Sequence, residues 1–169
     1  GVVIDQAMGV VNFDDLAISG VTGTHFDLNN SNATITVTLD STTGITSTAG
    51  RALEITNLTG GSFAFDGGPI TDGDLGVHIN GNAVSVASTI ANALDIDNAS
   101  AIGLVIANNT GGTIALTGSI DIDSVDIQGA NIASNTNVTI SDASVSVLNG
   151  GGGGALALNM SNNAMLSAT

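Results

Sequence analysis

Apolar and polar residues alternate along this chain in short runs, the pattern of half-buried β-strands. The runs are separated by Gly, Asn, Asp, Ser and Thr, which favour turns. Residues 53–65 read LEITNLTGGSFAF, and residues 104–116 read LVIANNTGGTIAL. The two segments share one frame of apolar, Asn, Thr and Gly-Gly positions, and the apolar pair Val77/Ile79 lies halfway between them. The sequence therefore predicts a repeat of about 25 residues.

Three sets of apolar positions recur at this spacing. The first set is Val2/Ile4, Phe26/Leu28, Leu53/Ile55, Val77/Ile79, Leu104/Ile106, Ala130/Ile132 and Leu156/Leu158. The second set follows each member of the first and is Val11/Phe13, Ile35/Val37, Phe63/Phe65, Val84/Val86, Ile114/Leu116 and Val138/Ile140. The third set is Leu16/Ile18, Ile45, Ile70, Leu94/Ile96, Ile120/Ile122 and Val145/Val147.

Three short strands in each repeat are typical of a parallel β-helix, in which stacked coils bury a continuous apolar column. We predict an all-β fold: a single right-handed parallel β-helix (β-solenoid) of about six to seven coils, forming one domain over residues 1–169. The alternative is a β-sandwich of short strands, which leaves the fixed spacing unexplained. The predicted core contains Leu53, Ile55, Phe63, Phe65, Val77, Ile79, Leu104, Ile106, Ile114 and Leu116.

Composition agrees with a narrow core and excludes several functions. Hydrophobic residues make up 43% of the chain, with four Phe and neither Trp nor Tyr. The formal net charge is -14, with one basic residue, Arg51, so we expect neither nucleic acid nor an anionic membrane surface as a partner. The absence of Cys excludes disulfides and thiolate metal sites. No apolar run is long enough to predict membrane insertion.

The frame ITNLTGGSFAF and IANNTGGTIAL resembles the coils of right-handed parallel β-helix repeats in large secreted or surface bacterial proteins. These include adhesins, autotransporter passengers and fibre-like stalks. The resemblance extends over most of the chain as a pattern. It implies a right-handed coil and an extracellular or cell-surface location, and it implies no catalytic residue.

Acidic residues recur at the coil spacing. Asp95 and Asp97 lie 26 residues before Asp121 and Asp123, so stacking should place the four side chains together on the outer surface. We expect Asp72 and Asp74 one coil earlier. Carboxylates from adjacent coils could hold Ca²⁺; the alternative is a solvated acidic edge screened by salt. No other cofactor is required.

A second polar column, Asp27, Glu54 and His78, should point outward with Arg51 nearby and His25 just outside it. Carboxylates beside a possible base would suit a polysaccharide lyase or hydrolase. The sequence has no Trp or Tyr to stack on a sugar ring, so we predict that the chain is not an enzyme.

Threonine and asparagine suggest two further features. Thr34, Thr36 and Thr38 alternate as in an ice-binding row, but we expect no repetition of this row in adjacent coils. Asn57 and Asn108 occupy equivalent places in the repeat, and we expect them to form an inward hydrogen-bonded ladder. Asn-x-Ser/Thr sequons begin at Asn32, Asn57, Asn98, Asn108, Asn137 and Asn159.

The ends favour self-association. A strand pattern begins at Val2, a seventh coil begins near Leu156, and the single proline, Pro69, is internal. We therefore expect a processed product or fragment whose end coils are uncapped. The predicted function is a structural segment of an extracellular β-helical fibre, stalk or matrix protein. It would stack end to end with other copies or with neighbouring segments of a longer chain. The alternative is a carbohydrate-active enzyme, or a carbohydrate- or receptor-binding adhesin module.

Overall fold

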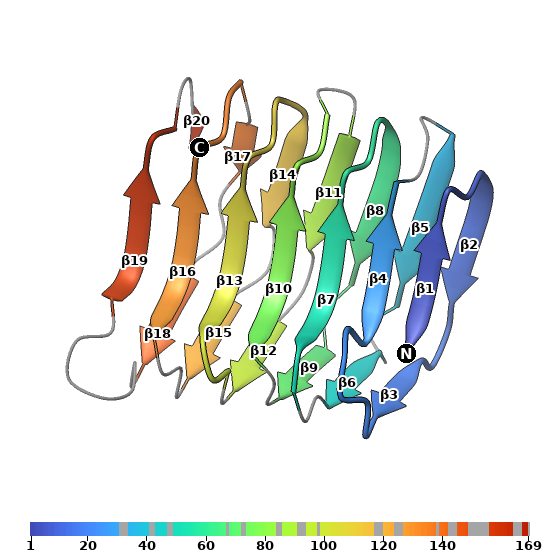
Figure 1. The fold of residues 1–169 in the computed structure, drawn as a ribbon, viewed down its shortest axis with the longest axis horizontal. Coiled ribbons are helices and arrows are strands. Elements are labelled where there is room, and N and C mark those ends of the chain that lie inside the picture. The colour runs from blue at the N-terminus through green and yellow to red at the C-terminus, as the bar shows by residue number, and fades with distance from the viewer. Residues whose placement is uncertain are drawn as a thin grey trace.

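The computed structural model describes residues 1–30, 34–40, 43–46, 49–66, 68–71, 74–83, 86–90, 94–97, 99–116, 120–123, 127–137, 139–141, 145–148, 156–163 and 167–168. Its regular structure is formed by β-strands stacked in three sheets (Figure 1). Within these residues there is no helix long and apolar enough to cross a membrane.

Successive strands go to sheets A, B and C in turn, and each sheet contains every third strand. Sheet A contains β1 (Val2–Asp5), β4 (Phe26–Asn29), β7 (Arg51–Thr56), β10 (Leu75–Asn80), β13 (Ile102–Ala107), β16 (Gln128–Ala133) and β19 (Leu156–Ser161). Sheet B contains β2 (Gly9–Phe13), β5 (Ile35–Leu39), β8 (Gly61–Phe65), β11 (Val86–Ile90), β14 (Thr113–Leu116), β17 (Thr139–Ser141) and β20 (Ser167–Ala168). Sheet C contains β3 (Ala17–Ser19), β6 (Gly44–Thr46), β9 (Gly68–Thr71), β12 (Leu94–Asp97), β15 (Ile120–Asp123) and β18 (Val145–Leu148).

The prediction of a parallel solenoid with three strands in each coil is confirmed. The strand pairs β1·β4, β2·β5 and β3·β6 are parallel, and so are the later pairs in each sheet. A β-sandwich of consecutive antiparallel strands is therefore excluded. In Figure 1 the strands of sheet A lie side by side and all point in the same direction, across the long axis of the stack.

The expected number of six to seven coils needs correction. Among the residues whose burial is described, buried side chains from all three sheets occur in about four turns, from β4 to β15. In the first turn, Val2, Ile4 and Val11 are only partly buried. An end turn has a neighbour on one side only, so its strands pair without a fully closed core.

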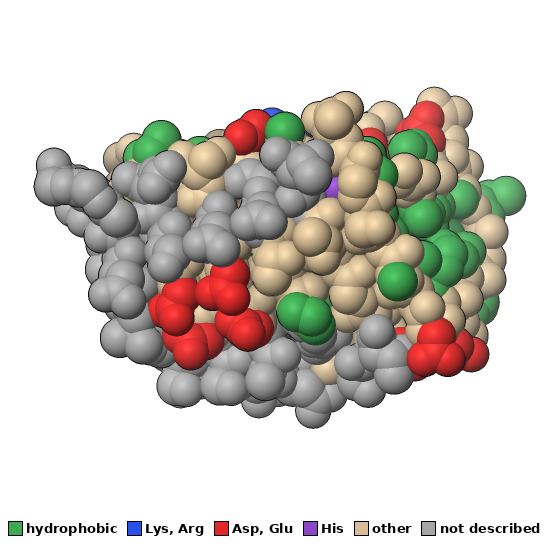
Figure 2. Space-filling view, turned by 90° about the horizontal axis from the view of Figure 1, so that it is seen from below, with side chains coloured by type: hydrophobic (Ala, Val, Ile, Leu, Met, Phe, Trp, Pro, Cys, Tyr) green, Lys and Arg blue, Asp and Glu red, His purple; other side chains and the backbone are tan. Residues whose placement is uncertain are grey.

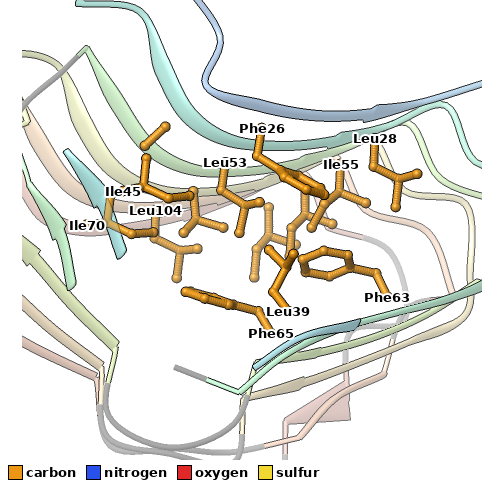
Figure 3. Close-up of a cluster of buried hydrophobic side chains, with 14 of the residues drawn as sticks. Phe26, Leu28, Leu39, Ile45, Leu53, Ile55, Phe63, Phe65, Ile70 and Leu104 are labelled. Carbon is orange, nitrogen blue, oxygen red and sulfur yellow. The ribbon is translucent and has the colours of Figure 1, made fainter. Parts of the chain in front are cut away.

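Apolar side chains stack in columns along the inside of the coil, and Figure 3 shows their central part. The ring of Phe26 lies edge-on to Phe13 at 5.7 Å between centroids, and it lies 6.4 Å from that of Phe63. The predicted core residues are buried, except that the side chain of Leu116 lies outside the described part. Four phenylalanines thus supply the bulk that Trp and Tyr supply in other cores.

The predicted register is correct for the third set and for most of the first. Ile18, Ile45, Ile70, Ile96 and Ile122 follow one another directly across sheet C. In sheet A the first-set pairs align from Val2/Ile4 to Ala130/Ile132. The last pair is wrong, because Ala130 and Ile132 face Leu158 and Met160.

The second set contains one error of two residues and one of four. Val11 and Phe13 face Val37 and Leu39, so the pair Ile35/Val37 is shifted. Phe63 and Phe65 face Ser88 and Ile90 instead of Val84 and Val86. Val84 lies outside the described residues, as does Val138 of the last predicted pair. Ser88 is buried within this apolar column.

An asparagine ladder is present, but it is formed by different residues from those predicted. Asn57 and Asn108 are exposed and adopt positive φ angles of 57° and 55° at the corner between sheets A and B. The residue after each corner points inward instead. The inward side chains form a continuous ladder through Asn82, Asn109, Asn135 and Asn163.

Each rung of the ladder fastens one coil to the coil before it. The backbone N–H of Asn82 donates to Oδ1 of Asn109 at 3.0 Å, and Nδ2 of Asn109 donates to the carbonyl oxygen of Ile79 at 3.2 Å. Asn109 in turn donates from its backbone to Oδ1 of Asn135 at 3.1 Å. At Leu58, the ladder position holds an apolar residue whose N–H donates to Asn82. The ladder satisfies buried backbone groups at the corner.

Candidate functional site

The outer face of sheet A carries a column of polar side chains, as the sequence predicted. Asp27 on β4 faces Glu54 on β7, and Glu54 faces His78 on β10. The next residue in this column, Val105 on β13, is buried and apolar. Stacking at the strand spacing of about 4.8 Å therefore brings two carboxylates and one imidazole together.

Glu54 is the centre of this cluster. Its Oε1 accepts from Arg51 Nη1 and lies 3.3 Å from His78 Nδ1. Its Oε2 accepts from the hydroxyl of Thr24 at 3.3 Å. Neighbouring strands leave the residue only 8% exposed. Both oxygens of Glu54 are thus engaged within the protein, and Glu54 forms an ion pair with Arg51 on its own strand.

The two neighbours of Glu54 have shifted pKa values. Burial raises the pKa of Asp27, and repulsion from Glu54 and Asp5 adds to this effect, while Arg51 opposes it. Burial also lowers the pKa of His78; Arg51 adds to the lowering, and the contacts with Glu54 oppose it. Asp27 is therefore protonated at a higher pH than an ordinary aspartate, and the lowered pKa of His78 favours its neutral form near neutral pH.

His25 lies in a different place from the one predicted. It is fully buried beside the first strand of sheet A, where its backbone oxygen accepts from the N–H of Val2 and its backbone N–H donates to the carbonyl oxygen of Arg51. The residue two positions later, Asp27, points outward. Strand alternation would put His25 and Asp27 on the same face, so the buried position of His25 reflects the corner that precedes β4.

The second predicted cluster lies on the outer face of sheet C. Asp95 faces Asp121, and Asp97 faces Asp123, so the four residues form an acidic quartet over β12 and β15. Acidic side chains gather on this side of the molecule in Figure 2. Oδ1 of Asp121 and Oδ1 of Asp123 are shielded from solvent, and no hydrogen-bond donor among the described residues reaches them. Desolvation, followed by repulsion from Asp121 and Asp97, raises the pKa of Asp123.

The predicted extension of the quartet to the preceding coil is wrong for Asp74. The positions before Asp95 and Asp97 are occupied by Pro69 and Thr71. Asp74 lies in the turn before β10, where it accepts from the hydroxyl of Ser100 at 2.7 Å and from the N–H of Gly50 at 3.2 Å. The other residue named for this coil, Asp72, lies outside the described residues.

Calcium binding by the quartet stays a prediction. Among the described residues, no group of three or more His, Asp or Glu side chains is arranged to hold a metal ion. If the quartet takes up Ca²⁺, millimolar calcium should raise the melting temperature above that in sodium chloride of equal ionic strength. The variant Asp121→Asn should lose this gain. A melting curve that responds equally to the two salts would leave a solvated acidic edge.

Acidification should relieve repulsion in the quartet. The pKa of Asp123 is raised above its ordinary value of 3.8, so the native state binds this proton more tightly than the unfolded chain. The repulsion should therefore be fully present above the raised pKa, decrease as pH falls through it, and vanish below 3.8. Asp123→Asn should melt at a higher temperature than the wild type at pH 7, with a smaller difference at acidic pH.

Asp14→Asn is the control for this pH dependence, because Asp14 is an exposed carboxylate in the first turn. It removes the same single charge without touching the quartet, so it should change the melting temperature little. A difference between Asp123→Asn and the wild type that stays constant with pH would contradict the explanation.

The remaining surface features are scattered. Thr36 faces Val10 and Ser62, and Thr38 faces Asn12 and Ala64, so adjacent coils do not continue this threonine row. Three of the sequon asparagines are exposed: Asn57, Asn108 and Asn137. Asn159 lies on β19, and Asn32 and Asn98 lie outside the described residues.

Comparison of the chain with protein-family models, with curated proteins and with solved structures found no match. The function is therefore inferred from the coil, its edges and its charged clusters.

Proposed function

We propose that this chain is a structural segment of an extracellular or cell-surface β-helical fibre, stalk or matrix protein, on a right-handed coil. The observation that carries the proposal is the pair of open edges. Within the described residues, β1, β2 and β3 pair on one side only, and so do β18, β19 and β20 at the other end of the stack. Unpaired strand edges are templates for further strands.

The internal chemistry supports a structural role. The asparagine ladder and the contacts of Glu54 with Thr24 and His78 join one coil to the next. Most coil corners are only a few residues long, which leaves little material for the long loops that shape a catalytic groove. These features favour a stack that resists unfolding over a site that processes a substrate.

The charge of -14 predicts how assembly depends on the solvent. Like charges repel at low ionic strength, and salt or divalent cations screen this repulsion. We expect the purified chain to remain monomeric in low salt and to form elongated particles in high salt. Light scattering and negative-stain electron microscopy measure this directly. Monomers at every salt concentration would reject self-assembly as the function.

The second candidate is a carbohydrate-active enzyme or a carbohydrate- or receptor-binding module on the same scaffold. The adjacent carboxylates of Asp27 and Glu54, with His78 beside them, are the observation in its favour. Hydrolysis or β-elimination of a polysaccharide that is lost in Glu54→Gln but retained in Asp74→Asn would support this candidate. Absence of turnover over a broad set of acidic and neutral polysaccharides would favour the structural role.

A further inference from the structure

We infer that the open edges join head to tail in the register of the coil itself, so that β19 and β20 of one copy lie on β1 and β2 of the next. The inference rests on the proposed structural function and specifies its partner as a second copy of this chain. It also predicts which residues meet. Continuing the register of sheet A would place Leu158, Asn159 and Met160 on the partner copy's Val2, Val3 and Ile4.

The apolar column supports this register. Met160 continues the column of Ile79, Ile106 and Ile132, yet it is 51% exposed. At the opposite edge, Ile4 begins the same column and is only partly buried. Stacking the two ends would extend one apolar column through the joint, as it extends between neighbouring coils.

The backbone corners at the two ends have the same shape. Gln6 follows β1 with φ 51°, and Asn162 follows β19 with φ 52°. In the intervening coils the N–H of the corner residue donates to the strand of the following coil, as Asn57 does to Asn80 and Ser134 does to Ser161. Across the proposed joint, the N–H of Asn162 would make the same bond to the first turn of the next copy, which has a matching corner at Gln6.

The backbone at Gly9 on β2 leaves space for a strand of a preceding coil. It has φ +101°, and a Cβ at Gly9 would meet nothing within 4 Å. Gly61 has φ +90° on the equivalent side of β8, and its Cβ would lie 2.2 Å from the carbonyl oxygen of Ile35 in the preceding coil. The backbone of the first turn thus leaves open the space that a preceding strand fills at Gly61.

The distribution of acidic residues between the two ends of the stack favours this joint. The first turn carries Asp5, Asp14 and Asp15. Strands β17 to β20 at the other end contain no acidic residue. The sequence from residue 128 onward has one acidic residue, Asp142. Contact between the first turn and this end therefore brings together fewer like charges than contact between two first turns, which favours head-to-tail over head-to-head contact. A heterologous contact of this kind continues into a filament.

The ladder supplies a gain-of-function test. Ala7 follows the corner residue Gln6, in the place that Asn109 and Asn135 occupy in later coils. Each ladder asparagine reaches back to the coil before it, so Ala7→Asn has no such coil within its own chain. Across the proposed joint, Oδ1 of the new residue would accept from the N–H of Asn163. Its Nδ2 would donate to the carbonyl of Met160.

Ala7→Asn should therefore lower the protein concentration at which filaments appear by at least about tenfold, the effect of one or two net hydrogen bonds. Ala7→Leu is the matched control. It adds a side chain of similar size, and leucine occupies the equivalent position at Leu58, but it makes no such bonds. Equal effects of the two variants would overturn the predicted register.

Cysteine pairs test the same register independently, because the chain contains no native Cys. Val3→Cys combined with Asn159→Cys would place two sulfurs on one face of adjacent strands, at a spacing compatible with a disulfide. Mild oxidation of the filaments should give a series of disulfide-linked multimers. Val3→Cys combined with Met160→Cys puts the sulfurs on opposite faces and should give none.

The outcomes separate the two proposals. Filaments that form no disulfide-linked multimers, and that form at the same protein concentration with Ala7→Asn as without it, would overturn this joint and leave the structural function in place. Monomers in high salt for every variant, including Ala7→Asn, would reject both.

Discussion

Replacing Phe65 with alanine should lower the free energy of unfolding by about 3 to 5 kcal/mol, the range for deleting a large buried aromatic side chain. Phe65 is fully buried on β8 and faces Leu39 on β5. Its ring extends from sheet B into the cluster of buried apolar side chains (Figure 3). Small residues from short strands cannot move inward to fill that volume, because hydrogen bonds to both neighbouring coils hold each strand.

Phe13→Ala is the matched control, since Phe13 belongs to the same column but lies in the partly buried first turn. Its loss should cost about 1 to 2 kcal/mol, because less apolar area leaves contact with the core. Urea unfolding of both variants measures the difference. Equal costs would mean that the end turn is as well packed as the centre.

The sequence predicted the fold because one set of apolar positions recurs at a nearly constant spacing. Ile45 and Ile70 are isolated apolar positions between turn residues, and the strands pair them with each other and with Ile18. The second set was less certain for a physical reason. Ile35, Val37 and Leu39 alternate in one run, and a shift of two residues leaves every side chain on the same face. Backbone pairing chooses between the two alignments, and the apolar pattern does not.

The candidate clusters were predictable to the extent that they lie within strands. Asp95 and Asp121 pair as expected because both follow the apolar residue that begins their strand. Asp74 was misplaced because it precedes a strand of sheet A, where the chain turns a corner. The contacts of Glu54 with Arg51 and Thr24 depend on side-chain conformation, which residue spacing does not specify.

The corner between sheets A and B shows most clearly that residue spacing does not specify which side chain points inward. The adjacent residues Asn108 and Asn109 test the assignment. Asn109→Ala should lower the free energy of unfolding by about 2 to 6 kcal/mol, because each buried polar group left unpaired costs about 1 to 3 kcal/mol. The variant leaves the N–H of Asn82 without its acceptor and the carbonyl of Ile79 without its donor. Asn109 is 1% exposed, so water cannot replace these bonds without opening the coil.

Asn108→Gly is the control at the neighbouring position. Asn108 is exposed, and its φ of 55° is a conformation that glycine adopts without strain, as Gly81 does at the equivalent corner with φ 70°. The change removes a 2.8 Å surface hydrogen bond to Asn80, so the expected effect is within about 1 kcal/mol. Chemical denaturation of the two variants decides which asparagine carries the ladder. A larger loss at Asn108 than at Asn109 would restore the assignment made from the repeat alone and contradict the inward ladder.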